Sequence, residues 1–224
     1  MTTPSKSTLD AMPEPQHPHL FNEILAGLIL GALAVAWLFS LWQLAPGPLA
    51  WVTLRVLGTL SYAALAVATA FGALVASKYS PDWLGRAVQF GWHGLLSGFA
   101  LLTGILHGLF LIVDGQYAQS LTAILLPGGS SFKPLEVGLG TLGLYGLMLV
   151  YASYVWRDRL RLKPNVWRMI HRLAYPVFIA LTLHAGWTGS DPLLPLYLTA
   201  IAAVTLNTTL RVLEGLTAKR DALP

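Results

Sequence analysis

Long apolar runs, free of Asp, Glu, Lys and Arg, alternate with short polar segments along this chain of 224 residues. Each run has 18 or more residues. At about 1.5 Å per helical residue, each is long enough to cross a hydrocarbon core of roughly 30 Å. The six runs are Ile24–Leu44, Val56–Ser77, Ala87–Val113, Val137–Trp156, Leu173–Ser190 and Pro192–Leu210. The pattern predicts an all-α integral membrane protein, built as a six-transmembrane-helix bundle.

The basic residues between the runs predict how the chain is oriented. If the N-terminus is cytoplasmic, the outer segments hold only Arg55 and Lys133, and the cytoplasmic segments hold the other twelve basic residues. These are Lys6, Lys78, Arg86, Arg157, Arg159, Arg161, Lys163, Arg168, Arg172, Arg211, Lys219 and Arg220. An excess of Lys and Arg marks the cytoplasmic side of membrane proteins. We therefore predict a multi-pass protein with both termini in the cytoplasm.

Composition agrees with this class and excludes several others. Hydrophobic residues make up 55% of the chain and charged residues 11%, and the mean hydropathy is +0.61. Because basic residues gather on one side of the membrane, the net charge of +4 indicates topology rather than nucleic-acid binding. The chain has no cysteine, which excludes disulfides, thiolate catalysis and iron–sulfur clusters. The first apolar run is too long for the core of a cleaved signal peptide.

The segments outside the bundle carry no recognisable motif. Residues 1–20 are polar and rich in proline, and we expect a disordered cytoplasmic tail in which His17 and His19 are solvated. Residues 21–213 form the predicted six-helix domain, and residues 214–224 form a cytoplasmic C-terminal tail. The turn Ala45-Pro46-Gly47-Pro48 should end the first helix, with the second beginning near Leu49. The longest outer loop, roughly Asp114–Pro134, is expected to be a solvated connector.

The basic segment after the fourth run, RDRLRLKPNVWR, has two interpretations that the sequence leaves open. It is the charge block that sets topology. It is also suited to be a docking surface for an acidic soluble electron donor, since rim charges steer association.

Four histidines carry the candidate chemistry. His93 and His107 lie on the third run, and His171 and His184 on the fifth or at its edge. Ionisable side chains inside a membrane are costly and mark functional sites. Since both helices are predicted to run outward, His93 and His171 lie at the cytoplasmic level and His107 and His184 further out. Imidazole is a common axial ligand of haem iron, so two levels of paired histidines suggest two stacked haems between the third and fifth helices.

The two spacings fit this hypothesis unequally. Fourteen residues place His93 and His107 about 21 Å apart along a helix and near one face. Thirteen residues would turn His171 and His184 roughly 140° apart in a straight helix. We expect Pro176, which lies between them, to kink or rewind the helix.

Other residues fit a haem site less specifically. Arg55, Arg86 and Arg172 are candidates to pair with haem propionates, although snorkelling or topology also explains them. Phe178 is a candidate to lie between the haems, and packing is the alternative. Glycines on the third helix allow a macrocycle or a neighbouring helix to come close. These are Gly91, Gly94, Gly98, Gly104 and Gly108.

These residues resemble the ferric reductase-like transmembrane domain family, which includes NADPH oxidases and ferric-chelate reductases. The resemblance covers the second to sixth helices. It rests on His93 with His107, on Trp167-x-x-x-His171-Arg172-Leu173-x-Tyr175, and on His184. It implies two bis-histidine b-type haems, with His93 and His171 as ligands of the inner haem and His107 and His184 as ligands of the outer haem.

Larger members of this family carry a flavin and nicotinamide domain after the last helix, and here only Arg211–Pro224 follow. No phosphate-binding glycine-rich turn is present, so we expect no unaided oxidation of NAD(P)H. The chain is similar to short bacterial members, among them haem subunits of periplasmic methionine sulfoxide reductase systems. The resemblance implies the bacterial inner membrane, a separate cytoplasmic flavin reductase or quinol as donor, and an outer acceptor. That acceptor is a ferric chelate, oxygen or a periplasmic reductase protein.

Two rival functions stay open at this point. One is a haem-binding membrane anchor for a periplasmic reductase, with no reaction of its own. The other is a transporter without haem that uses the histidines as a proton relay. The near absence of acidic residues within the runs disfavours the relay, because such relays commonly combine histidine with Asp or Glu.

Overall fold

The computed structural model describes residues 46–75, 77, 86–189 and 193–221, together with Leu28, residues 31–32 and Val35. The side chains of residues 46–48, 86–88 and 218–221 are outside this description. The predicted N-terminal tail and nearly all of the first apolar run lie outside the described residues, as do the turn after Lys78 and the chain end. The remaining helices belong to one compact unit that begins at Pro46.

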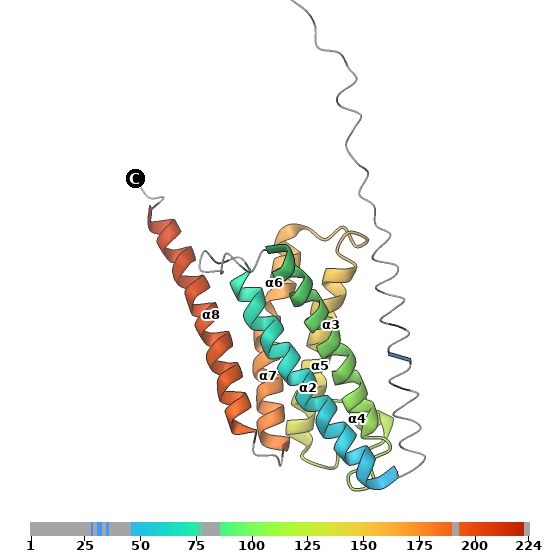
Figure 1. The fold of residues 1–224 in the computed structure, drawn as a ribbon. Coiled ribbons are helices and arrows are strands. Elements are labelled where there is room, and N and C mark those ends of the chain that lie inside the picture. Colours follow the sequence, from blue (N-terminus) through green and yellow to red (C-terminus); the bar gives the residue numbers. More distant parts are fainter. Residues whose placement is uncertain are drawn as a thin grey trace, which may run out of the picture. The chain divides into compact units, whose positions relative to one another are not determined.

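The described part of this unit is helical and contains no strand (Figure 1). Its helices are α2 (Pro46–Leu74), α3 (Arg86–Phe110), α4 (Leu121–Leu125), α5 (Pro134–Val155), α6 (Pro164–Arg172), α7 (Ala174–Thr188) and α8 (Leu194–Asp221). Four of them are long and apolar enough to cross a membrane: α2, α3, α5 and α8. The chain is therefore a multi-pass membrane protein by the length and composition of its helices.

The fifth predicted crossing, Leu173–Ser190, corresponds to α7, which has 15 residues. At about 1.5 Å per residue it rises only about 22 Å, less than a full crossing. The short helix α6 precedes it directly. Within the described residues, four long helices correspond to predicted crossings. The fifth predicted crossing corresponds to the shorter α7, which follows α6 directly.

Proline marks three helix starts rather than helix ends. α5 and α6 begin at Pro134 and Pro164, and α2 begins at Pro46, three residues before the predicted start near Leu49. The prediction placed Pro46 and Pro48 in a turn. The first turn of a helix tolerates proline, because its N–H groups have no partner within the helix.

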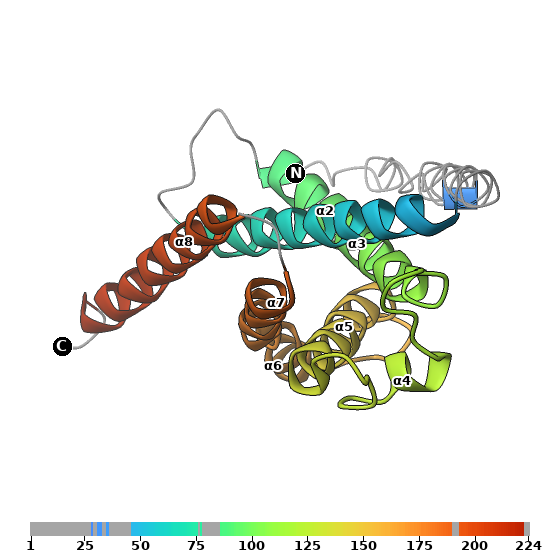
Figure 2. The ribbon, with the colours of Figure 1, turned by 90° about the horizontal axis from the view of Figure 1, so that it is seen from below.

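Two helix pairs and one flanking helix form the unit. α2 packs along α3, α5 packs along α7, and α8 lies against α2 (Figures 1 and 2). A core of buried apolar side chains joins all five helices, with Tyr62 from α2, Ala100 from α3, Leu147 from α5, Phe178 from α7 and Val204 from α8. Large apolar side chains elsewhere on these helices are exposed, as expected for surfaces that face lipid.

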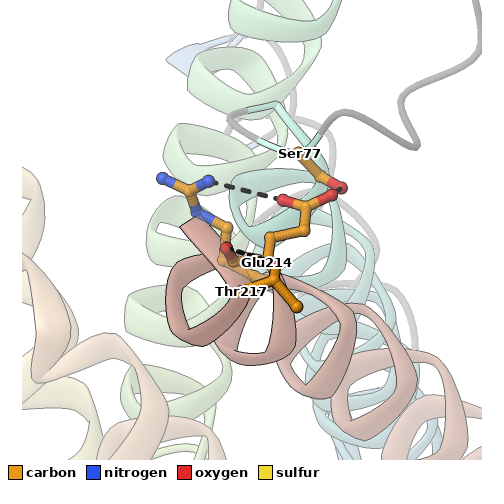
Figure 3. Close-up of polar contacts among 4 residues, drawn as sticks. Ser77, Glu214 and Thr217 are labelled. Atoms are coloured by element: carbon orange, nitrogen blue, oxygen red, sulfur yellow. Dashed lines mark hydrogen bonds and ion pairs between the residues drawn. The ribbon is translucent and has the colours of Figure 1, made fainter. Parts of the chain in front are cut away.

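The far ends of α2 and α8 are joined by polar side chains (Figure 3). The Ser77 hydroxyl donates to Glu214 Oε1 at 2.6 Å, and the Arg211 guanidinium lies 3.5 Å from Glu214 Oε2. The Thr217 hydroxyl donates to the Glu214 backbone carbonyl at 3.0 Å. The last two contacts lie within α8, and the bond between Ser77 and Glu214 holds α8 to the chain just beyond the last turn of α2.

The segment expected to be a solvated connector, Asp114–Pro134, is more ordered than predicted. It contains α4, and the carbonyls at the end of α4 accept hydrogen bonds from Thr141 and Tyr145 of α5 at 2.9 and 2.6 Å. Within the segment, Gln119 Oε1 accepts from the buried Ser130 hydroxyl at 3.1 Å. Polar groups that leave water need such partners, and these bonds explain why the segment can lie close to the helices.

Candidate functional site

The structure brings the four histidines together as two pairs, one pair at each level. The rings of His93 on α3 and His171 on α6 have centroids 5.9 Å apart, with planes at 67°. The rings of His107 on α3 and His184 on α7 have centroids 6.1 Å apart, with planes at 79°. Each histidine thus faces the partner that its level in the sequence predicts.

These separations suit two axial ligands of one iron. A metal–nitrogen bond of about 2 Å on each side of an iron places the centres of two imidazole rings about 6 Å apart. Among the described residues, no cluster of three or more His, Cys, Asp or Glu side chains could hold a metal ion. A haem iron needs only two protein ligands, because the macrocycle supplies the other four. The donor set of each pair fits this group.

Three of the four histidines are oriented by a backbone carbonyl. His93 donates from Nδ1 to the carbonyl of Ala68, His107 to that of Leu54 and His184 to that of Glu136, each at 2.8 Å. A carbonyl oxygen can only accept, so the proton lies on Nδ1 and the lone pair on Nε2. This tautomer leaves Nε2 free to bind a metal, and an acceptor of this kind fixes the ring and raises its basicity.

A glycine lies four residues after each of these carbonyls and makes room for the ring. A Cβ on Gly58 would lie 2.8 Å from His107 Nδ1, and one on Gly140 would lie 2.7 Å from His184 Nδ1. A Cβ on Gly72 would lie 3.1 Å from His93 Cε1. Only the missing Cβ lets an imidazole approach a helix closely enough to reach a carbonyl that the helix already uses. The same device appears three times, on α2 twice and on α5 once.

The fourth histidine is held differently. Among the described residues, no hydrogen-bond partner reaches the buried Nδ1 of His171. Its ring instead stacks on the indole of Trp167, with centroids 5.1 Å apart and planes at 24°. The Arg157 guanidinium carbon lies 4.7 Å from the centroid of the same indole. Trp167 therefore contacts both Arg157 and His171.

The helix that carries His171 and His184 is interrupted, as its 13-residue spacing requires. The interruption lies at Leu173, between α6 and α7, and Pro176 follows in the first turn of α7. The prediction attributed the change of direction to a kink at Pro176 itself. Proline has no N–H to donate to the carbonyl four residues earlier, and its ring crowds that carbonyl. The helix therefore ends before Pro176, which lies in the first turn of the next helix, where proline is tolerated.

A cavity adjoins the His107–His184 pair. It encloses about 1520 Å³ of empty space, part of which is open to the surroundings. Its walls are mainly apolar and include Gly58, Gly104 and Gly140, as well as both histidines. Arg55 also lines this cavity, with its guanidinium carbon 5.0 Å from the centroid of the Trp51 ring. The space suits a large planar apolar ligand with an acidic edge.

The remaining predicted residues are placed as follows. Phe178 is buried on α7 and stacks on Tyr62, with centroids 5.9 Å apart and planes at 17°. Arg172 is exposed in the last turn of α6. Arg86 is the first residue of α3, and its side chain, like His17 and His19, lies outside the described residues.

Sequence reasoning singled out glycines of α3 and missed those that contact the histidines. A Cβ on Gly91 or Gly94 would meet nothing within 4 Å. The missed residues did leave a signal: Gly58 and Gly72 are fourteen residues apart, the same spacing as His93 and His107. In antiparallel neighbours, equal spacing lets each glycine face one histidine. Trp167 was noticed only as part of a motif.

Comparison with known proteins identifies one family. The family model described as "Ferric reductase like transmembrane component" matches residues 57–182, which is more than half of the chain. The match includes His93, His107 and His171, and His184 lies two residues beyond its end. No curated protein matches the chain, and neither does any solved structure.

Proposed function

Since the chain belongs to the ferric reductase-like transmembrane component family, we propose that it is a two-haem cytochrome b that carries electrons across a membrane. The observation that supports this most is the pair of facing imidazoles at each of two levels. One pair alone would be compatible with a structural role. Two pairs with nearly the same separation, each with one histidine on α3, would provide two successive sites for an electron.

In this proposal His93 and His171 hold one b-type haem and His107 and His184 hold the other. Each haem would supply an iron that changes by one electron between its ferric and ferrous states. The protein holds the imidazoles in the tautomer that binds iron, through the carbonyls of Leu54, Ala68 and Glu136. It also excludes water with the apolar side chains of its core.

The direction of transfer follows from the predicted topology. His93 and His171 would lie towards the cytoplasm of a bacterial inner membrane, where a flavin reductase or quinol would deliver the electron. His107 and His184 would lie towards the outside, where a ferric chelate, oxygen or a periplasmic reductase would accept it. The buried Phe178, on α7 between the two levels, is proposed to lie on the path between the haems. Arg55, Arg86 and Arg172 are proposed partners of propionates.

The first test is a reduced-minus-oxidised visible spectrum of the purified chain, with haem quantified per polypeptide. We expect two b-type haems per chain. Protein made with ample haem that binds none would overturn the proposal and favour the proton-relay function.

The pairing is tested by single substitutions. His107→Ala and His184→Ala should each leave one haem, and the remaining haem should have the same midpoint potential in both variants. His93→Ala should retain the other haem instead and serves as the matched control. Two haems remaining in either His107→Ala or His184→Ala would contradict the assignment of ligands.

A further inference from the structure

The four histidines do not have equivalent surroundings. His93, His107 and His184 each donate from Nδ1 to a carbonyl of a neighbouring helix, with a glycine that opens the approach. His171 has no such acceptor in the part of the chain that the structure describes, and its buried Nδ1 makes no hydrogen bond there. Something else has to determine the orientation of this ring, because an imidazole without a second-shell partner can rotate about its side-chain bonds.

The position of His171 near the end of a short helix makes a contact that orients its ring more important. It lies in the last turn of the nine-residue helix α6, two residues before the interruption at Leu173. Ends of short helices have fewer backbone hydrogen bonds and open more easily than helix centres. The other three histidines belong to longer helices, with His93 and His107 on α3 (25 residues) and His184 on α7 (15 residues), although His107 is also in the last turn of its helix.

Trp167 lies one helical turn before His171 on the same face of α6, the i, i+4 relation in which side chains contact each other. The two rings are nearly parallel, at 24°, and offset, with centroids 5.1 Å apart, which is a favourable stacking geometry. The indole also contacts the Arg157 guanidinium, whose carbon lies 4.7 Å from the ring centroid. Indole is the ring that attracts cations best, and arginine is the cation most often found in such contacts. Trp167 thus has two ring contacts, one with a cation from the α5–α6 connection and one with the imidazole.

We propose that Trp167 is the positioning residue of His171, and that it does by stacking what a backbone carbonyl does for the other three histidines. Arg157 keeps the indole in place. The inference rests on the proposed function, because it concerns a ligand of the haem nearer the cytoplasm. The two haems would then differ chemically. The haem held by His93 and His171 would have one ligand whose Nδ1 has no partner among the described residues, and the haem held by His107 and His184 would have two ligands with carbonyl acceptors.

Stacking, rather than a hydrogen bond of the indole, carries the proposal. Trp167 Nε1 is also buried and has no hydrogen-bond partner among the residues that the structure describes. An indole retained only for its N–H donor would be expected to have an acceptor. Phenylalanine keeps a flat ring at this position and removes the N–H, whereas leucine removes the flat ring. The two substitutions therefore separate the two roles.

The experiment compares Trp167→Leu, Trp167→Phe and wild type in the full-length, haem-loaded protein. Electron paramagnetic resonance of the ferric state reports the angle between the planes of the two axial imidazoles. A redox titration reports the midpoint potential of each haem. The matched control is Trp156→Leu, which removes an exposed indole, 50% accessible, just before Arg157.

We expect Trp167→Leu to broaden or shift the signal of the haem held by His93 and His171 and to change its midpoint potential. The signal of the haem held by His107 and His184 should stay as in wild type, which shows that the protein is folded. Trp167→Phe should restore most of the wild-type signal, and Trp156→Leu should leave both signals unchanged.

Three results would overturn the inference. One is an unchanged signal in Trp167→Leu. A second is Trp167→Phe being as perturbed as Trp167→Leu, which would assign the role to the indole N–H. The third is equal loss of both haem signals in Trp167→Leu, which would make Trp167 a general stability residue. If wild type itself lacks haem, the proposed function fails instead, so the two failures are distinguishable.

Discussion

Gly140→Ala is the sharpest perturbation of the histidine pair formed by His107 and His184. A Cβ at Gly140 would lie 2.7 Å from both Nδ1 and Cε1 of His184 and 3.0 Å from its Cγ. Ordinary van der Waals contact begins near 3.4 Å. The difference of about 0.7 Å is the distance by which the imidazole has to withdraw from α5, since the helix backbone cannot yield as easily as a side chain.

This withdrawal breaks the bond that orients the ring. His184 Nδ1 is 2.8 Å from the carbonyl oxygen of Glu136, on the same helix face as Gly140. A shift of about 0.7 Å away from α5 lengthens this distance to about 3.5 Å, beyond the range of an N–H···O hydrogen bond. Losing the second-shell partner of a metal-binding histidine typically lowers metal affinity by about 10- to 100-fold, or about 1.4–2.7 kcal/mol.

The same substitution also raises helix propensity, which stabilises the fold rather than affecting haem binding. Alanine favours the helix over glycine by about 1 kcal/mol. We therefore expect Gly140→Ala to fold and to insert normally, while it loses one haem or releases it faster to a haem acceptor such as apomyoglobin. Haem per chain and the rate of haem release measure this directly.

Gly186→Ala is the matched control, because it lies two residues after His184 and a Cβ there would meet nothing within 4 Å. It should retain both haems. Full haem content in Gly140→Ala, with a wild-type release rate and unchanged potentials, would refute the reasoning. So would loss of haem in Gly186→Ala, because the effect would then not depend on the contact with the ring.

Three further predictions concern other contacts. Tyr62→Phe removes a 3.1 Å hydrogen bond to Thr182 and should lower the free energy of unfolding by about 0.5–1.5 kcal/mol, seen as a lower Tm with both haems retained; loss of haem would contradict this. Glu214→Ala removes the carboxylate that accepts from the buried Ser77 hydroxyl and should lower the free energy of unfolding by about 1–3 kcal/mol. Most of this comes from the hydrogen bond, because the ion pair with the half-exposed Arg211 contributes little. An unchanged Tm would refute this prediction. The ring planes at 67° and 79° should give both ferric haems strongly anisotropic low-spin resonance signals, and signals typical of parallel imidazoles would contradict the geometry.

The helices of this protein were predictable because a membrane imposes a simple rule on sequence. A backbone in hydrocarbon has to satisfy its own hydrogen bonds, so each long apolar run becomes a helix. The runs beginning at Val56, Ala87, Val137 and Pro192 correspond to α2, α3, α5 and α8. Their ends were less predictable: α8 continues to Asp221, eleven residues beyond its apolar run, because charged residues do not interrupt a helix once it has left the apolar region.

The sequence was enough to predict which histidines face each other, but not which backbone groups hold their rings. Position along a helix determines depth, so His93 can be matched with His171 and His107 with His184 from spacing alone. The carbonyls that hold three of them belong to α2 and α5, far away in sequence. Nothing local in the sequence marks Leu54, Ala68 or Glu136 as acceptors, because every residue has a carbonyl.

The sequence by itself determined the membrane class, the helices that its apolar runs form, and two levels of histidines, since all of these depend on residue type and on spacing along one helix. Only the tertiary structure decided which glycines admit the rings and where the helix before Pro176 ends. It also showed that His171 stacks on Trp167 instead of donating to a carbonyl. These features depend on how closely two helices approach at one point, and that distance is set by the packing of all the side chains between them.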